Sequence, residues 1–288
     1  MRIGTRGSAL ALAQADWVAQ RLPGDTEIVT ITTTGDRQQA IGDKSRWVSE
    51  LEQALLEDRI DLAVHSAKDV PAELAEGLEL VAIPRRADPR DAICGVASLA
   101  SMDAGDRVGT SSLRRAAQIR SVRDDLEVVE IRGNVDTRLR KLAQGEVDAL
   151  VVAYAGLQRL GRAEEASGIL DDLVPAAGQG ALALEGRAGA VTAEQLSELR
   201  DPEATACVLT ERELTRALEA SCNTSVGAHA RILGEGRIEL RAWVGLPDGS
   251  AWCRDTAQGE QPGLGTLVAE RMLAAGAGEL LREAERVG

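Results

Sequence analysis

The stretch DRIDLAVHSAKDVP, residues 58–71, decides the fold because a second segment of the chain is built on the same plan. It begins with an acidic turn, continues into a short apolar run that predicts a buried strand, and ends in a polar loop. The segment GEVDALVVAYAGL, residues 145–157, has the same three parts in the same order. The repeat predicts two related domains, each with such a strand inside its sheet.

Strand and helix patterns alternate around both segments. RIGTRGSALALAQADWVAQRL, residues 2–22, predicts a strand, a loop and a helix with Ser8 as its N-cap. DRVGTSSLRRAAQIRSV, residues 106–122, predicts the same succession, and Gly145 is placed to end a later helix. This alternation predicts α/β domains with mostly parallel sheets.

The last part of the chain has a different pattern. VLTERELTRALEA, residues 208–220, predicts a helix, and residues 237–255 predict two strands around a PDGS turn. The segment LVAERMLAAGAGELLREAE, residues 267–285, predicts a closing pair of amphipathic helices. Together these elements predict a small α+β domain.

The composition excludes several classes of function. The 288 residues carry a net charge of −13 and only 2% aromatic residues, which argues against a nucleic-acid binder. No apolar run is long enough to span a membrane, and polar residues interrupt the N-terminus where a signal peptide needs apolar ones. A cytoplasmic protein is therefore expected. The four cysteines are widely spaced without metal-type pairs, so no metal is expected.

Charged and polar side chains follow the expected strands. Ligands of open α/β sheets bind beyond the carboxyl ends of the strands, and two domains whose strand ends face each other make a cleft there. Residues 107–141 hold nine basic and five acidic residues, a positive island in an acidic chain. Arg114 and Arg115 stand at an expected helix N-terminus, where they suit carboxylates or phosphates. A solvated basic face, paired with nearby acids, is the alternative.

The chemistry of the residues alone does not decide the roles of three positions. Asp69 is either a cap or turn residue paired with Lys68, or a group that holds a ligand. His65 is expected to be a satisfied residue of the core or of the layer behind a site. Cys222 lies in a polar loop after a helix and is either a reactive thiol or an inert one.

Eight motifs together resemble those of the porphobilinogen deaminase family, also called the hydroxymethylbilane synthases. They follow the family's order over essentially the whole chain: RIGTRGSALALAQA, TTGD, HSAKDVP, DPRDA, VGTSSLRR, RGNVDTRL, AGLQRLG and PAAGQGA. The resemblance implies an α/β fold, with two periplasmic-binding-protein-like domains facing a cleft and a small C-terminal α+β domain. The implied domains are residues 1–84 with 181–198, residues 89–174 and residues 202–288.

The resemblance implies a transferase of porphyrin, tetrapyrrole and heme biosynthesis. Such an enzyme condenses four porphobilinogen molecules head to tail, releases ammonia and forms the linear tetrapyrrole hydroxymethylbilane. It carries a dipyrromethane cofactor, here implied to be covalently linked through Cys222, which primes the chain. A monomer is expected, with porphobilinogen as its small-molecule partner and no nucleic-acid or membrane partner.

The resemblance also implies roles for individual residues. Asp69 is the implied catalytic carboxylate, which stabilises the cationic azafulvene left when ammonia departs and helps to move protons. Every pyrrole carries an acetate and a propionate, so a set of basic and polar groups is implied to bind or neighbour substrate and cofactor. The set is Arg6, Ser8, Gln14, Asp36, Lys44, Lys68, Thr110, Ser112, Arg114, Arg115, Arg132 and Arg138.

Some positions depart from the family's pattern. The cysteine loop reads EASCNTSVG, with Ala220 and Ser221 where the family has two glycines, and no proline follows. A backbone that needs a positive φ at either position would be strained. In the expected lid, residues 36–47, Ala40 stands in place of a lysine and Trp47 in place of a phenylalanine.

The alternative function is a non-catalytic carboxylate-ligand binding protein of the periplasmic-binding-protein type. Two related α/β lobes around an anion cleft suit such a protein. It predicts an unmodified Cys222 and tolerance of the substitution Asp69→Asn, apart from a change in affinity.

Overall fold

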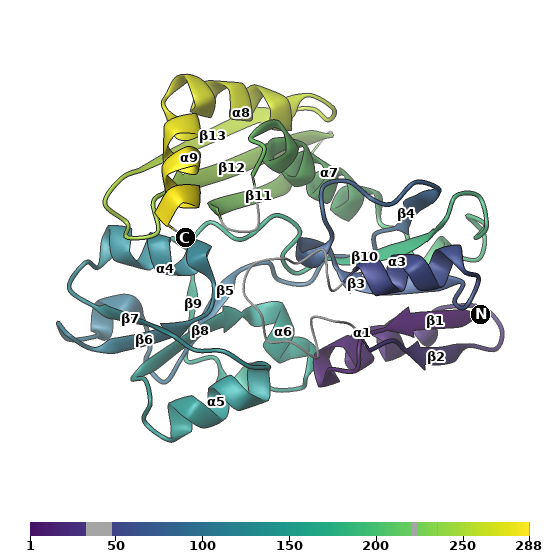
Figure 1. Cartoon of the computed structure of the whole chain (residues 1–288), viewed down its shortest axis with the longest axis horizontal. Helices are drawn as coiled ribbons and strands as arrows, with labels where there is room; N and C mark the ends of the chain where they lie inside the picture. The colour runs from purple at the N-terminus through teal and green to yellow at the C-terminus, as the bar shows by residue number, and fades with distance from the viewer. Residues whose placement is uncertain (33–47, 221–223, 235, 288) are drawn as a thin grey trace. The chain divides into compact units, whose positions relative to one another are not determined.

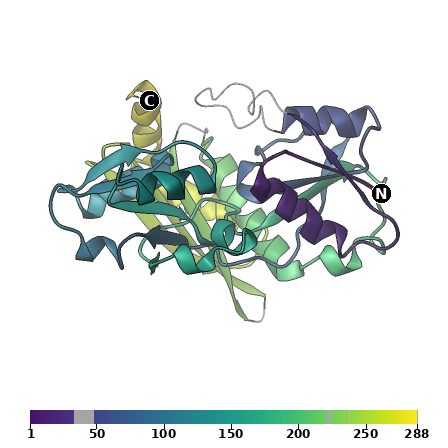
Figure 2. The same cartoon turned by 90° about the horizontal axis from the view of Figure 1, so that it is seen from below.

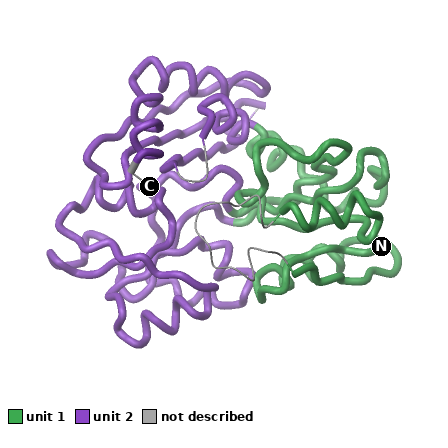
Figure 3. Tube along the Cα trace, viewed as in Figure 1, with its two compact units in different colours: residues 1–87, 180–209 green, residues 88–179, 210–288 purple. Residues whose placement is uncertain are grey.

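A computed structural model describes residues 1–32, 48–220, 224–234 and 236–287. The chain forms two compact units, residues 1–87 with 180–209 and residues 88–179 with 210–288 (Figure 3). In the described part of the chain, each unit holds one five-stranded sheet, and the second unit also holds a three-stranded sheet. No helix among these residues is long and apolar enough to cross a membrane.

The sheet of the first unit has the strand order β2-β1-β3-β10-β4. Its strands are β1 (Arg2–Thr5), β2 (Glu27–Thr30), β3 (Leu62–Ser66), β4 (Leu78–Ala82) and β10 (Leu182–Arg187). Helices α1 (Ala9–Ala19) and α3 (Ser49–Leu56) pack on its opposite faces (Figures 1 and 2).

Strand β3 lies at the centre of this sheet and is buried on both faces. Its side chains alternate between the faces, so Leu62 and Val64 pack into the core beneath α1, while Ala63 packs against Leu51 and Leu55 of α3. A strand covered on both sides needs apolar residues in succession, which explains the apolar run in the sequence. The strand predicted from residues 58–71 is confirmed.

The large sheet of the second unit has the order β7-β6-β8-β5-β9. Its strands are β5 (Asp91–Cys94), β6 (Arg107–Thr110), β7 (Glu127–Glu130), β8 (Ala149–Ala153) and β9 (Gly168–Leu170). The helices that accompany it are α4 (Leu113–Val122), α5 (Val135–Ala143) and α6 (Tyr154–Arg159). Gly145, with φ 72°, lies just beyond the end of α5, which confirms the predicted helix stop.

The sheet topology confirms the repeat. Strands β3 and β8, which the two repeated segments form, each take the third place in the strand order of their sheet. Four of the five strands in each sheet run in one direction, which confirms the prediction of mostly parallel sheets, while β10 and β5 run antiparallel to both of their neighbours. Strand β5 is the first strand that the chain forms after it enters the second unit at residue 88, and β10 is the first strand after it returns to the first unit at residue 180. The direction of β5 and β10 depends on where the chain enters the sheet, and local residue patterns do not indicate that direction.

The three-stranded sheet of the second unit is antiparallel, with the order β11-β12-β13. Its strands are β11 (Ser225–Gly234), β12 (Arg237–Gly245) and β13 (Trp252–Gly259), and the helices of this part of the chain are α7 (Pro202–Ala217), α8 (Leu264–Ala274) and α9 (Ala277–Val287). Helices α8 and α9 pack along β12 and β13 (Figure 1). The predicted helix, the two strands around the PDGS turn and the closing helix pair are confirmed.

A buried carboxylate fixes two backbone segments to helix α7. Glu211 is 0% exposed; its Oε2 accepts the Gly178 N–H at 2.6 Å and its Oε1 accepts the Ala230 N–H at 2.7 Å. Hydrogen bonds to a charged acceptor are stronger than those between neutral groups. Glu211 therefore holds the turn before β10 and strand β11 against one helix.

Replacing Glu211 by alanine is expected to lower the free energy of unfolding by about 2–5 kcal/mol, because it leaves two buried N–H groups without an acceptor, at about 1–3 kcal/mol each. Urea unfolding measures the change. Glu270→Ala, at an exposed position of α8, is the control and should change stability by no more than about 0.5 kcal/mol. A loss below about 1 kcal/mol for Glu211→Ala would contradict the expectation.

Candidate active site

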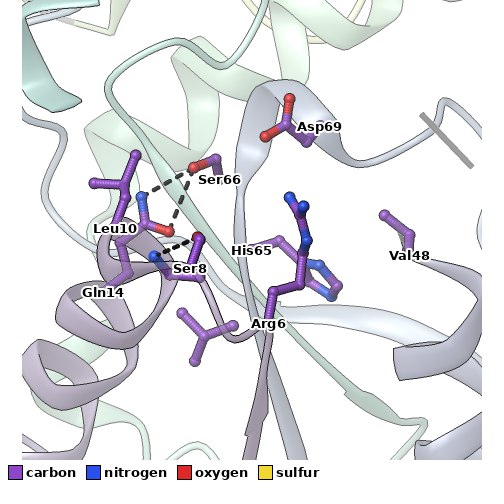
Figure 4. A pocket seen from close by; sticks show the side chains of 10 residues that line it. Arg6, Ser8, Leu10, Gln14, Val48, His65, Ser66 and Asp69 are labelled. Atoms are coloured by element: carbon purple, nitrogen blue, oxygen red, sulfur yellow. Dashed lines mark hydrogen bonds between the residues drawn. The ribbon is translucent and has the colours of Figure 1, made fainter. Parts of the chain in front are cut away.

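A pocket in the first unit gathers polar side chains from several elements (Figure 4). Strands β1 and β3 are parallel neighbours, so their carboxyl ends open at one edge of the sheet, where ligands of such sheets bind. The polar groups are Arg6 and Ser8 after β1, Gln14 on α1, His65 and Ser66 on β3, and Asp69 on the short 3-10 helix η2 (Ala67–Asp69). The structure thus brings together four of the residues with implied roles.

Hydrogen bonds hold one wall of this pocket in place. Ser8 caps α1, as predicted, and its Oγ accepts the Ala11 N–H at 3.2 Å. Gln14 is 3% exposed, and its Nε2 donates to the Ser66 Oγ at 2.9 Å. Because these side chains are already paired, the wall is preorganised for a ligand.

Asp69 is half-buried at the end of η2. The Ala67 N–H donates to the Ala181 carbonyl at 3.0 Å, which ties this turn to the strand region of β10. Figure 4 shows the Asp69 carboxylate and the Arg6 side chain reaching into the same pocket. Lys68 lies on the same turn but outside the group of described residues that line the pocket.

A second group of residues with implied roles lies at the carboxyl end of β6, in the second unit. Thr110 ends the strand, and its Oγ1 accepts the Ser112 N–H at 3.2 Å. Ser112 caps α4, with its Oγ accepting the Arg115 N–H at 3.4 Å. The strand, the capping serine and the helix repeat the arrangement around Ser8, as the internal repeat predicts.

Arg114 and Arg115 converge on Asp91, the first residue of β5. The Asp91 Oδ2 accepts from Arg114 Nη2 at 2.8 Å, and its Oδ1 accepts from Arg115 Nε at 3.0 Å and from Gln179 Nε2 at 2.7 Å. Asp91 is 0% exposed and both arginines are 5% exposed, so a solvated basic face is the wrong description of this pair. Burial raises the pKa of Asp91, but the charges of Arg114 and Arg115 outweigh it and hold that pKa well below its ordinary value.

Arg138 is a half-buried guanidinium of this unit whose surroundings favour a bound anion, and its Nε donates to the Gly133 carbonyl at 2.8 Å. Burial, followed by the charge of Arg115, lowers the pKa of Arg138 to about 10. The buried Nε of Arg114 has no hydrogen-bond partner among the described residues. A carboxylate nearby would stabilise the charged form of Arg138 and could accept such a donor. Arg132, by contrast, is exposed, and its Nε donates to Glu130 at 2.7 Å.

Two family models match this sequence. Residues 1–195 match the model of the porphobilinogen deaminase dipyromethane cofactor binding domain, and residues 205–274 match that of the porphobilinogen deaminase C-terminal domain. The chain belongs to the porphobilinogen deaminase family. It is 42% identical over 301 residues to the porphobilinogen deaminase of Brevibacillus brevis, covering 99% of this chain and 97% of the relative. It is 45% identical over 300 residues to that of Deinococcus radiodurans, covering 97% of each.

Arg159 is a candidate site residue of this chain that the sequence patterns did not single out. It ends α6, which follows β8 as η2 follows β3 in the repeat. Burial lowers the pKa of Arg159 to about 10, so this guanidinium too is desolvated. The available signal was the motif AGLQRLG, which contains Arg159.

Several positions with implied roles lie outside the described residues: Asp36, Lys44 and Cys222, together with the lid segment 36–47. Three other cysteines form no disulfide in the described part of the chain: Cys94, Cys207 and Cys253. Burial raises the pKa of Cys94 to about 11, which makes its thiol a poor nucleophile. No group of three His, Cys, Asp or Glu side chains in the described ranges is placed to hold a metal ion.

Replacing Asp91 by asparagine is expected to lower the free energy of unfolding by about 3–5 kcal/mol near pH 7, because it leaves two buried guanidinium groups without their counter-charge. A depressed folded-state pKa stabilises the protein fully above the unfolded-state pKa of about 4, and this stabilisation is lost as the pH falls toward the folded-state value. Urea unfolding of both proteins should show a constant difference from about pH 7 to 5, shrinking below about pH 4.

Asp125→Asn is the matched control. Asp125 forms an exposed ion pair with Arg123 at 2.7 Å, and such pairs contribute at most about 1 kcal/mol. Equal losses in the Asp91 and Asp125 variants, or a difference for Asp91 that stays constant down to about pH 3, would contradict the expectation.

Proposed function

We propose that the chain condenses four porphobilinogen molecules head to tail, with release of ammonia, to form hydroxymethylbilane. One observation carries this proposal: in a chain of the porphobilinogen deaminase family, Asp69 lies in one pocket with Arg6, Ser8 and Gln14. That pocket combines an anionic group that can stabilise a cation with donors that can hold carboxylates.

We propose that basic and polar groups hold the acetate and propionate side chains of the substrate. Arg6 and Ser8 serve in the pocket of the first unit, with Lys68 beside it. Arg138 and Arg132 serve in the second unit. A guanidinium forms paired hydrogen bonds with a carboxylate, so desolvated arginines such as Arg138 suit a polyanionic chain.

The residues of the second unit fit a dipyrromethane group, which carries the same carboxylate side chains. The buried Arg114 Nε without a described partner and the desolvated Arg138 both favour a bound anion. Thr110, Ser112, Arg114 and Arg138 would hold this group, with the covalent link at Cys222. When bound, dipyrromethane supplies the pyrrole to which the first substrate unit is joined.

We propose that Asp69 is the catalytic carboxylate. The loss of ammonia from an aminomethyl pyrrole leaves a cation, and a carboxylate fixed beside the pyrrole N–H stabilises that charge. Partial burial strengthens the interaction because less water screens it. Gln14 and Ser66 orient the pocket wall opposite this group through their hydrogen bond.

We further propose three domains, residues 1–84 with 181–198, 89–174 and 202–288, because each range contains one of the three sheets. A monomer in the cytoplasm is also proposed. Cysteines outside disulfides suit a reducing compartment, and the net charge of −13 disfavours nucleic acid as a partner.

Replacing Asp69 by asparagine is expected to lower kcat for porphobilinogen consumption by about 10²–10⁴-fold, because the variant keeps the size of the side chain and loses its charge. Asp16→Asn, at an exposed position of α1, is the matched control and should keep the wild-type rate. A binding protein without catalysis would instead show no turnover in the wild type and a mere change of affinity in the Asp69 variant.

The intact mass of the purified protein should exceed the sequence mass by two linked pyrroles. This excess should disappear in Cys222→Ala and persist in Cys253→Ala, which changes a cysteine in strand β13. An unmodified wild-type protein that gains no mass on incubation with porphobilinogen would rule out cofactor attachment at Cys222.

A further inference from the structure

A histidine and a glutamate form a buried pair at the wall of the pocket. The proposed function assigns no role to this pair. The His65 Nε2 lies 2.9 Å from the Glu185 Oε2, and the two side chains are 4% and 0% exposed. Strand β10 pairs with β3 in a register that sets Glu185 opposite Ala63, so Glu185 and His65 project from the same face of the sheet. The expectation that His65 is a satisfied residue is confirmed, but its ring also lines the pocket with Asp69.

Several charged groups surround the ring of His65. Glu185 contacts it from β10, and the Glu185 Oε1 is buried without a hydrogen-bond partner among the described residues. Glu52 of α3 adds a second carboxylate: burial and the charge of Glu185 raise the pKa of Glu52, while His65 lowers it. On the pocket side His65 shares the lining with Asp69 and with the cationic Arg6. A carboxylate only accepts hydrogen bonds, so a neutral His65 ring donates from Nε2 to Glu185 and keeps its other nitrogen as an acceptor.

The proposed reaction, on which this inference rests, requires the same pocket to stabilise a cation and to accept a proton. Asp69 stabilises the cation best while it is ionised, yet every condensation also releases a proton from the attacking pyrrole carbon. If Asp69 took that proton, it would lose the charge needed for the next unit until it was deprotonated again. A separate acceptor in the same pocket removes this conflict.

We propose that His65, supported by Glu185, is a second catalytic residue that accepts the proton of the attacking pyrrole carbon. The carbon–nitrogen bond of the aminomethyl ammonium group breaks, and its electron pair leaves on nitrogen as ammonia. The attacking carbon forms the new carbon–carbon bond with the exocyclic methylene. The C–H bond at that carbon then breaks, its electron pair restores the aromatic ring, and the proton passes to the ring nitrogen of His65 that does not face Glu185. Ammonia takes this proton and leaves as ammonium, so His65 returns to its neutral form.

The test uses porphobilinogen labelled with deuterium at its free α carbon, with cofactor-loaded protein and rapid quenching. Intact mass resolves each added unit. Only a unit already added carries deuterium at its attacking carbon, so the first addition breaks no labelled bond and is an internal control. His65→Gln should slow the second and later additions by about 10²-fold or more, and these additions should show a primary isotope effect larger than that of the wild type.

Two further variants separate the chemical role from a structural one. Glu185→Gln keeps an acceptor beside His65 and removes the charge, so it should slow the later additions by about tenfold and also raise their isotope effect; it answers the same question if His65→Gln does not fold. His229→Gln changes the chain's other histidine, on strand β11 of the second unit, and should keep the wild-type rate and isotope effect.

Slow later additions without a raised isotope effect in either variant would mean that the pair only supports the fold, and would overturn the proposal. Wild-type rates in both variants would overturn it as well. These results differ from a failure of the proposed function, in which wild-type protein with intact cofactor would consume no porphobilinogen at all.

Discussion

A carboxylate buried in an apolar sheet needs partners that donate hydrogen bonds to it, and this constraint shapes both five-stranded sheets. In the second unit Asp91 on β5 holds Arg114 and Arg115, and in the first unit Glu185 on β10 holds His65. Both carboxylates are 0% exposed, and both lie on the antiparallel strand of their sheet. An unpaired charge there would cost several kcal/mol, so the partner side chains are held firmly. The groups at each binding edge are thereby fixed from behind by the antiparallel strand of their sheet.

Local chemistry made much of the fold predictable. The apolar runs of β3 and β8 mark strands buried on both faces, Ser8 marks the start of α1, and Gly145 marks the end of α5. Each signal depends on neighbours within a few residues. The same holds for the pocket of the first unit, because Arg6 and Asp69 directly follow two strands whose parallel pairing brings their ends together.

Long-range pairings could not be predicted in this way. The motifs marked Arg114 and Arg115 as anion ligands, but they carry no sign that Asp91, more than twenty positions earlier, already occupies both guanidinium groups. His65 and Glu185 are 120 positions apart, on strands whose antiparallel pairing no periodicity reports. A buried pair of this kind depends on two residues far apart in the sequence and on the order of the strands that carry them. The sequence patterns therefore indicated each residue but not its partner.

The described residues just before the cysteine loop include one left-handed position. The sequence places Ala220 where the family has a glycine, and a left-handed backbone there would be strained. The structure places the left-handed residue one position earlier, at Glu219 with φ 51°, while Ala220 is not among the residues with positive φ. Helix α7 is held upstream by the hydrogen bonds of Glu211, so the chain leaves it from a fixed point. The left-handed conformation at the end of α7 is therefore carried by Glu219 and not by Ala220.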